Sequence, residues 1–528
     1  MADSAAKPRV TAVGSIAHEY LRNLALAAPV ILAALHPLVF ILQSHSTSHH
    51  FACDAIARPT LGIIGVALLA LLLVRRITGD VRFASVAGTF FFVILGLFPF
   101  LFTGEDAYSW PLYAGFLAAS VAMALGLARL LDGLVGVVIS WVLGVVVMWT
   151  AISAYATSAA VWPEPPWRDQ VDQLIARAES ITVHAPRKQP DIYYIVLDGL
   201  ARVDVLESMY GLQAGQSVGE LEALGVQIPR RSRSNYAQTQ LSLASALNIQ
   251  YLDELAAVMG DRFDRRPLIR LIADAGAVTA LRRRGYDVVV VKSGTSIGTH
   301  RESGCRFSNL PPGPTELELA LLKRLPVPNS FFHRATLRAH RHQVMRSFDA
   351  IEDAASDRPM LVVAHVVSPH PPFVIGEDGN ERLGQDYFTF IDGDAFPGSR
   401  GQYIAGYRAQ AAFVLRRIAR VVQRIVARSP GSYIIIHSDH GPGLGLVNTD
   451  AERTDAFERL SIFSAYYAGG DVAPVPDTMS PVNALRWALR HALDADVPLL
   501  EDRSYLSDYL HPYRLTEIAP ERPQPGAR

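Results

Sequence analysis

The chain has 528 residues, which is long for one ordinary domain and predicts roughly two or three folded units. Its formal net charge of −1 gives no basic surface for a nucleic acid, so a nucleic-acid-binding protein is not expected. The two cysteines, Cys53 and Cys305, are too few for a disulfide framework or for a metal site built from cysteines.

Charged residues are sparse in the first part of the chain, between residues 24 and 156. The second apolar stretch there is the weakest, because it must extend past Arg58, whose charged head would have to reach the membrane interface. We predict a membrane domain with five transmembrane helices over residues 1–158, since each stretch approaches the roughly 20 apolar residues that a spanning helix needs. The stretches are residues 24–42, 55–74, 83–102, 112–128 and 134–155.

Basic residues predict the orientation of these helices. They precede the first stretch and join the second to the third and the fourth to the fifth, at Lys7, Arg9, Arg22, Arg75, Arg76, Arg82 and Arg129. The positive-inside rule then places the N-terminus in the cytoplasm. An odd number of spans delivers the remainder of the chain to the other side of the membrane, so the C-terminal domain is expected to be extracytoplasmic.

After a proline-containing linker (159–189), which includes a short amphipathic helix, the pattern alternates between strands and helices over residues 190–515. Residues 516–528 are expected to be a disordered tail. The strand candidates are continuously apolar, which is typical of a mostly parallel central sheet covered by helices on both faces. Strands are predicted at 192–198, 286–293, 360–368, 433–439 and 462–468, and helices at 169–179, after Thr239, at 268–284 and at 403–427.

Acidic and histidine side chains follow the predicted strands. Asp198, His365, His370, Asp439 and His440 fall at carboxyl ends of strands, where the sites of such sheets lie. Asp439 and His440 offer one oxygen and one nitrogen ligand, a pair that suits zinc or manganese. Asp198 adds a second carboxylate. The alternative for Asp198, which precedes a glycine, is an ordinary turn.

A hydroxyl-rich segment between these strands, residues 234–245, offers a nucleophile. Thr239 stands at an expected helix start, where backbone amides and the helix dipole favour anionic groups. A threonine hydroxyl beside a metal would be activated as an alkoxide. The alternative role for Thr239 is a helix cap, and Ser242 and Ser245 are the other candidate hydroxyls.

Four segments carry a resemblance to a known family. Residues 195–204 (IVLDGLARVD), 234–245 (SNYAQTQLSLAS), 365–373 (HVVSPHPPF) and 437–443 (HSDHGPG) resemble the alkaline phosphatase/sulfatase superfamily. The resemblance is greatest to its membrane-anchored sulfatase-like branch, which includes lipoteichoic acid synthases and phosphoethanolamine transferases. It implies an alkaline-phosphatase/sulfatase-like α/β domain behind a multi-span anchor. The expected location is the bacterial inner membrane, with the catalytic domain periplasmic or extracellular.

The resemblance also implies roles for individual residues. Asp198 takes the place of the first acidic metal ligand, and Asp439 and His440 take the place of the paired ligands. Thr239 corresponds to the threonine that is both nucleophile and ligand, and His370 to a histidine that contacts the substrate phosphate. Residues expected to face the substrate are Arg202, Asn235, Lys292 and His365.

The sequence also departs from relatives in this superfamily. It lacks the Cys-x-Pro-x-Arg and Ser-x-Pro-x-Arg signatures of true sulfatases, which disfavours sulfate ester hydrolysis. The histidines of a second metal set are missing, so one divalent metal, zinc or manganese, is expected. The loop 441–455 contains no histidine, unlike that of the phosphoethanolamine transferases, which argues against ethanolamine-phosphate specificity.

The function predicted from these features is metal-dependent transfer or hydrolysis of a phospho group on an envelope lipid or glycan, through a threonine nucleophile. One alternative is a non-catalytic sulfatase-like protein of envelope assembly or binding. A further alternative is a sulfatase or phosphodiesterase. The sequence indicates neither the donor and acceptor nor the oligomeric state.

Overall fold

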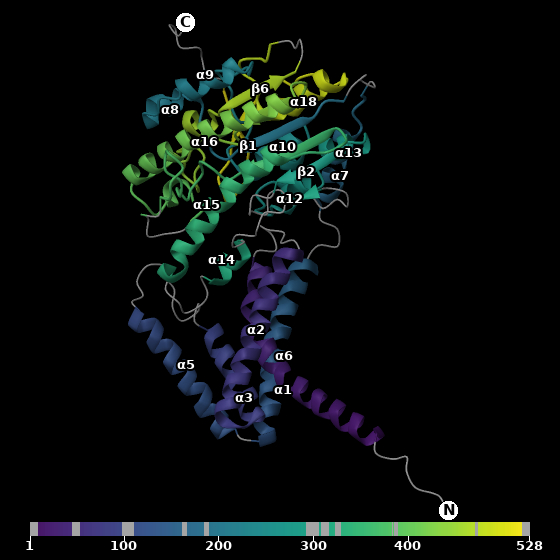
Figure 1. The fold of residues 1–528 in the computed structure, drawn as a ribbon, viewed down its shortest axis with the longest axis vertical. Helices are drawn as coiled ribbons and strands as arrows, with labels where there is room; N and C mark the ends of the chain where they lie inside the picture. Colours follow the sequence, from purple (N-terminus) through teal and green to yellow (C-terminus); the bar gives the residue numbers. More distant parts are fainter. Residues whose placement is uncertain are drawn as a thin grey trace, which may run out of the picture. The chain divides into compact units, whose positions relative to one another are not determined.

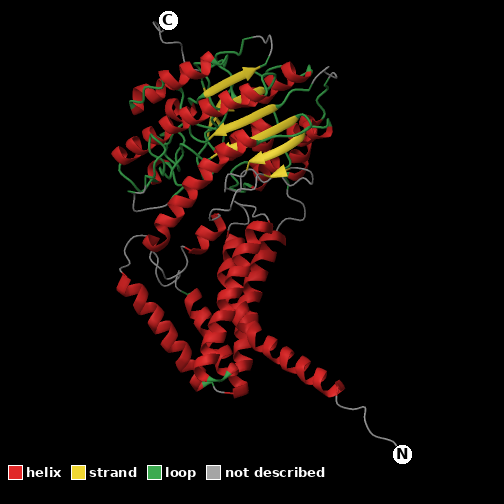
Figure 2. Cartoon of the chain, in the orientation of Figure 1, coloured by secondary structure: helices red, strands yellow, loops and turns green. Residues whose placement is uncertain are grey.

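The computed structural model describes residues 9–44, 53–97, 110–131, 133–160, 166–183, 189–291, 306–307, 316–322, 329–382, 384, 389–469 and 474–519. The chain divides into two compact units. Helices α1, α2, α3, α5 and α6 lie in the first unit, together with α14 from much later in the chain (Figure 1). All strands, yellow in Figure 2, belong to the second unit.

The first unit contains the predicted apolar helices. Their bounds are Arg9–Ser44 (α1), Cys53–Thr78 (α2), Val81–Gly96 (α3), Trp110–Leu130 (α5) and Gly133–Ala160 (α6). Within the described residues, three apolar segments are long enough to cross a membrane: Leu21–Leu42, Ile56–Thr78 and Gly133–Thr150. The apolar segments of α3 and α5 are shorter. Five spans therefore remain a prediction.

Small side chains allow α1 and α3 to approach closely. A Cβ atom added at Gly88 would lie 3.1 Å from Val30 Cγ1, so only glycine leaves this contact unstrained. Nearby, the buried Ser85 hydroxyl donates a hydrogen bond to the Leu26 carbonyl at 2.5 Å. Small residues and hydroxyls at helix contacts are typical of membrane-embedded bundles.

Helix α14 (Glu316–Leu322) lies inside the range predicted for the catalytic domain, yet it belongs to the first unit. Leu317 is fully buried in an apolar cluster with Leu38 and Ile41 of α1. Glu318 forms an ion pair with Arg58 of α2. The pairing gives Arg58 a partner that sequence reasoning did not supply, because the two residues are distant in the chain.

The second unit is built on a six-stranded sheet with the order β3-β2-β4-β1-β5-β6. Neighbouring strands are parallel except β6, which runs antiparallel to β5. This architecture confirms the predicted mostly parallel α/β domain. The strands are Ile192–Leu197 (β1), Asp287–Val291 (β2), Arg306–Phe307 (β3), Met360–Val366 (β4), Tyr433–His437 (β5) and Ser464–Ala468 (β6).

Strand β1 is buried on both faces and divides the core into two. Alternate side chains belong to different apolar clusters, Tyr194 to one and Tyr193 to the other. The first cluster takes in α7 (Arg168–Glu179), α10 (Thr239–Leu247), α11 (Asp253–Met259), α12 (Arg266–Ala273), α13 (Gly276–Arg283) and α18 (Pro481–Leu493). The second takes in α8 (Val203–Tyr210), α9 (Gly215–Ala223), α15 (Asn329–Asp353) and α16 (Arg400–Arg428).

Two parts of the chain differ from the domain boundaries expected from sequence. Helix α7 falls in the predicted linker, but Val171 and Leu174 are buried in the core of the second unit. The predicted tail is structured at its start, where β8 (Thr516–Ile518) pairs with β7 (Ser504–Leu506). In both cases the segment is structured because it packs against, or pairs with, a segment that is distant in sequence. Local composition does not show such contacts.

The helix predicted over residues 268–284 is two helices, α12 and α13. The chain bends at Ala275, whose backbone is not helical, and the Gly276 amide then donates to Asn248 Oδ1 at 2.9 Å. A Cβ at Gly276 would lie 2.4 Å from the Ile175 carbonyl oxygen. The close approach of α7 therefore requires glycine and fixes the break.

Candidate active site

Three buried side chains converge where the central strands end. Asp198 follows β1, Asp439 follows β5, and His365 lies in β4 on the other side of β1. One potential ligand atom from each lies within 4.8 Å of the others. Because the carboxyl ends of parallel strands meet at one edge, residues distant in sequence come together there.

These side chains fit a divalent cation. Asp198 Oδ1 and Asp439 Oδ2 are buried and have no hydrogen-bond partner among the described residues. Buried carboxylate oxygens are costly to leave unpaired, so a cation between them would be strongly favoured. His440 Nε2 lies 3.7 Å from Asp198 Oδ1 and 3.3 Å from Asp439 Oδ2. Oxygen and imidazole nitrogen ligands suit zinc or manganese.

His365 lies closer to this group than expected for a residue that only contacts substrate. Its Nε2 is 3.1 Å from Asp198 Oδ2. Burial lowers the pKa of His365, but the hydrogen bond and charge of Asp198 outweigh this effect and raise it. His365 is therefore a further candidate ligand, or a partner that orients Asp198.

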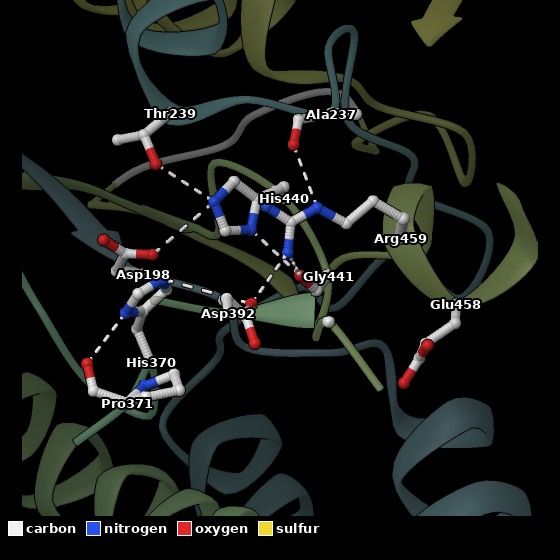
Figure 3. Close-up of polar contacts among 12 residues, drawn as sticks. Asp198, Ala237, Thr239, His370, Pro371, Asp392, His440, Gly441, Glu458 and Arg459 are labelled. Atoms are coloured by element: carbon white, nitrogen blue, oxygen red, sulfur yellow. Dashed lines mark hydrogen bonds and ion pairs between the residues drawn. The ribbon is translucent and has the colours of Figure 1, made fainter. Parts of the chain in front are cut away.

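The ring of His440 is oriented by its own loop. Its Nδ1 lies 2.9 Å from the Gly441 carbonyl oxygen, which accepts a hydrogen bond from Nδ1–H. The Nε2 atom then carries the lone pair, and it faces Thr239 Oγ1 at 3.0 Å (Figure 3). Such contacts fix the tautomer of metal-binding histidines. Burial, followed by the charge of Arg459, lowers the pKa of His440 and favours the neutral ring.

Thr239 is the first residue of α10, not its cap. The capping position belongs to Gln238, whose backbone is extended. The Thr239 hydroxyl is half-buried, and it points to His440 and not to a backbone amide of its own helix. It therefore combines the helix N-terminus with the candidate metal group, as expected for a nucleophile.

The carboxylate of Asp198 is held in its charged form. Burial by itself would raise the pKa of Asp198, but the nearby His370, His365 and His440 together lower it below the usual range. A charged carboxylate is the form that binds a metal.

A second buried carboxylate, which the sequence did not single out, lies beside His370. Asp392 accepts hydrogen bonds from Tyr403 Oη at 2.7 Å and from Arg459 Nη1 at 3.1 Å. His370 Nε2 lies 4.0 Å from Asp392 Oδ2. Burial opposes ionisation of Asp392, but His370 and Arg459 prevail and lower its pKa. Asp392 thus lies on the Nε2 side of the His370 ring.

Arg459 connects three parts of the site. It donates to the carbonyls of Ala237 at 2.9 Å and Gly441 at 3.0 Å, as well as to Asp392 (Figure 3). It thereby links the segment before Thr239 to the loop after β5. Arg459 lies in α17 (Ala456–Leu460), and no sequence pattern distinguished it from the other charged residues of this segment.

A pocket of about 550 Å³ opens beside the Thr239 hydroxyl. It combines the predicted catalytic side chains with residues that the sequence did not single out. The lining residues include Gln238, Thr239, Gln240, Arg265, His370, Asp392, His440, Arg459 and Tyr509.

The other predicted substrate residues have different surroundings. Arg202 forms an ion pair with Asp204 at 2.7 Å, and its guanidinium lies over the Phe457 ring. The amide of Asn235 donates to the Arg503 carbonyl at 2.8 Å and accepts from the Val482 amide at 2.8 Å. Both side chains thus make hydrogen bonds or ion pairs with other parts of the second unit. Lys292 lies outside the described residues.

No protein-family model and no curated protein matches the chain. Among solved structures, it is similar to the integral membrane lipooligosaccharide phosphoethanolamine transferase A from Neisseria meningitidis, with 11% identity, 90% of this chain and 96% of that chain covered, and a TM-score of 0.37. It is similar to the C-terminal periplasmic domain of EcEptC from Escherichia coli in complex with Zn, with 11% identity, coverage of 64% and 95%, and a TM-score of 0.39.

The phosphonate monoester hydrolase of Agrobacterium radiobacter also matches, with 14% identity, coverage of 60% of this chain and 80% of that chain, and a TM-score of 0.39. A phosphoethanolamine transferase, one of the classes that the motifs resemble, is thus among the structures found. At these identities and TM-scores, the matches assign neither an activity nor a site residue to this chain.

Proposed function

We propose that this chain is a membrane-anchored, metal-dependent enzyme that transfers or hydrolyses a phospho group through Thr239. The observation that carries the proposal is the position of the Thr239 hydroxyl. It lies 3.0 Å from His440 Nε2, at a helix N-terminus, and it lines a pocket. A hydroxyl in this environment is suited to attack an electrophilic phosphorus atom.

The proposed metal site consists of Asp198, Thr239, Asp439 and His440, with His365 close by. When bound, one zinc or manganese ion would lower the pKa of the threonine hydroxyl and offset negative charge on the phosphoryl oxygens. The two buried carboxylates of Asp198 and Asp439, and the imidazole of His440 with its Nε2 lone pair, support this assignment.

The side chains of Thr239 and His370 carry out the bond-making and proton-transfer steps. Thr239 gives its hydroxyl proton to solvent, and Oγ1 forms a bond to phosphorus while the bond from phosphorus to the leaving oxygen breaks, which leaves a phosphothreonine. His370, beside Asp392, supplies a proton to the leaving oxygen. A second hydroxyl, from a glycan or from water, then gives its proton to His370 and attacks phosphorus, while the bond from phosphorus to Thr239 Oγ1 breaks. Transfer and hydrolysis differ only in this acceptor.

The membrane helices suit a lipid donor, because an anchored site stays close to lipid headgroups. The distribution of basic residues supports a cytoplasmic N-terminus and a catalytic domain in the periplasm or at the outer surface. An envelope lipid or glycan is therefore the proposed substrate class. The missing formylglycine signature argues against sulfate esters.

The nucleophile is tested with full-length protein in detergent, incubated with candidate phospholipids and measured by intact mass spectrometry. Wild type is expected to gain the mass of the transferred phospho group, and Thr239→Ala to gain nothing and lose at least about a hundredfold in rate, since an activated nucleophile is removed. Thr239→Ser should retain part of the activity.

Ser242→Ala is the matched control, because Ser242 lies one turn further along α10 and is fully buried. It should behave like wild type. Unchanged activity in Thr239→Ala would contradict the nucleophile assignment. A wild-type protein without bound zinc or manganese and without turnover would favour the non-catalytic alternative.

A further inference from the structure

The charges that line the pocket do not balance. Among the described lining residues, the charged carboxylate is Asp392 and the guanidinium groups are Arg459 and Arg265. Asp392 and Arg459 neutralise each other at 3.1 Å. Arg265 is left as a positive charge in the pocket wall.

Arg265 is buried, with an exposed fraction of 3%, and its hydrogen bonds go to neutral acceptors. Nη1 donates to Gln240 Oε1 at 3.1 Å, and Nη2 donates to Gln238 Oε1 at 2.7 Å and to the Tyr509 carbonyl at 2.9 Å. Its Nε is buried without a partner among the described residues. A guanidinium has five N–H donors, so donors remain for a ligand.

Neutral partners satisfy hydrogen bonds but do not compensate the charge. Leaving a buried charge without a counter-charge is costly, and such groups are normally paired. The Tyr509 ring, 4.4 Å from the guanidinium carbon, offers some cation–π stabilisation. It does not replace an anion. The arrangement fits a site whose counter-charge arrives with the substrate.

The position of Arg265 relates this charge to the nucleophile. Its two glutamine partners stand immediately before and after Thr239, at the first turn of α10. Arg265 therefore lies beside the helix N-terminus, where backbone amides add to the positive potential. An anionic group placed there would be close to the phosphorus that Thr239 attacks.

We propose that Arg265, held in place by Gln238 and Gln240, forms a subsite for a second anionic group of the substrate, a carboxylate or a further phosphate, and that this subsite rejects a cationic ammonium headgroup. The inference rests on the proposed phospho-group chemistry, and it names the class of phospho compound that the pocket selects. The same positive charge would repel the ammonium of a phosphoethanolamine group.

The test compares three small phosphomonoesters of similar size by isothermal titration calorimetry on the full-length, metal-loaded protein in detergent. Phosphoglycolate carries an added carboxylate, 2-hydroxyethyl phosphate is neutral at that end, and phosphoethanolamine carries an ammonium. Wild type is expected to bind phosphoglycolate about tenfold more tightly than phosphoethanolamine, with the neutral compound between them.

Arg265→Gln should bring that ratio to about one, and Arg265→Lys, which retains the charge, should keep phosphoglycolate favoured. Arg514→Gln is the control, because it removes a positive charge from an exposed ion pair with Asp261. It should leave the ratio unchanged. Equal or tighter binding of phosphoethanolamine by wild type overturns the proposal, and so does an unchanged ratio in Arg265→Gln.

If Arg265→Gln does not fold, the wild-type and Arg265→Lys ratios decide. If Arg265 had only a structural role, its substitution would lower the thermal unfolding midpoint, and the wild-type protein would show no preference among the three compounds. That result would overturn the proposal. A preserved ratio without phosphothreonine overturns the proposed function alone. Phosphothreonine without the ratio overturns this inference alone.

Discussion

Three histidines of the second unit use the same local hydrogen bond for different purposes. In His370, His437 and His440, Nδ1 lies 2.8–2.9 Å from the carbonyl oxygen of the following residue. What differs is the partner of Nε2. In His437 it is the Tyr194 hydroxyl at 2.7 Å, whereas in His440 it is Thr239 and the carboxylates. His437 is therefore structural, although it lies next to the candidate ligands in sequence.

A pH dependence is expected from His340, a buried histidine of α15. Burial lowers its pKa to about 4, so the folded protein holds it neutral while the unfolded chain binds a proton below about pH 6.5. Stability is fully present above pH 6.5 and is lost as the pH falls towards 4, by at most roughly 3 kcal/mol. The thermal unfolding midpoint of the full-length protein should therefore fall over this range.

In His340→Gln part of that dependence should disappear, because glutamine does not titrate. Gln216→Asn serves as the control, since Gln216 is exposed on α9 and, like its replacement, does not titrate. It should retain the wild-type pH profile. Identical profiles for wild type and His340→Gln would contradict the assignment.

At the scale of elements, the loop after β5 is packed tightly against α17. A Cβ atom added at Gly441 would lie 2.0 Å from the Glu458 carbonyl oxygen, a backbone atom that cannot move alone. The Gly441 amide donates to the Arg459 carbonyl at 2.7 Å. This close approach explains why a glycine follows His440.

Gly441→Ala is expected to displace this loop and weaken zinc or manganese binding at least about tenfold, because the Gly441 carbonyl orients His440. Metal content by inductively coupled plasma mass spectrometry and a competition titration would measure the loss. Circular dichroism should show the helices and strands retained.

The matched control is Gly431→Ala, in the turn before β5, where a Cβ would meet no atom within 4 Å. It should bind metal like wild type. Equal affinities for the two variants would mean that the loop tolerates the displacement and that Gly441 does not orient the site.

Strands could be predicted from sequence because burial on both faces leaves continuous apolar runs, as in β1, β2 and β5. Breaks inside helices could not. The division between α12 and α13 depends on the carbonyl of Ile175, which is distant in sequence. The local sequence pattern indicates which side chains are buried. It does not indicate which distant backbone segment packs against them.

The same distinction holds for the site. Asp198 directly follows β1 and Asp439 lies two residues after β5, so their positions at the ends of apolar strands identified them in the sequence. Asp392, Arg459 and Arg265 come from loops or helix ends without periodic patterns. Only the bond between Asp392 and Arg459, and the bonds of the two arginines to the residues just before Thr239, identify them. His365 was singled out for a different role, because its distance to Asp198 is invisible in sequence.

At the scale of the whole molecule, the described part of the chain returns to the first unit after it has begun to form the second. It leaves that unit after the last apolar helix, folds part of the second unit, returns to contribute α14, and then completes the second unit. The apolar side chains of α14, Leu317 and Leu321, contact residues of the first unit. The second unit is therefore not a contiguous segment of sequence.

A fragment that begins at residue 164 is expected to aggregate, because Leu317 and Leu321 would lose their apolar partners and face water. Light scattering and size-exclusion chromatography would measure this. The same fragment with Leu317→Gln and Leu321→Gln should be more soluble by several-fold.

Changing two exposed apolar residues elsewhere provides the control. Replacement of Leu510, which is 51% exposed, and Phe457, which is 39% exposed, by glutamine should improve solubility far less. A fragment that remains monomeric without any substitution would contradict the expectation and show that α14 is tolerated in water.

The candidate site combines two kinds of support, and this division bears on how such a protein changes during evolution. The candidate metal ligands stand on the ends of β1, β4 and β5, whose positions are fixed by the sheet register. The pocket beside them is also lined by residues of connecting segments, such as Ile391, Leu446 and Tyr509. Insertions and substitutions in those segments leave the strands untouched. A lineage can therefore acquire a new substrate while its reaction chemistry is inherited unchanged.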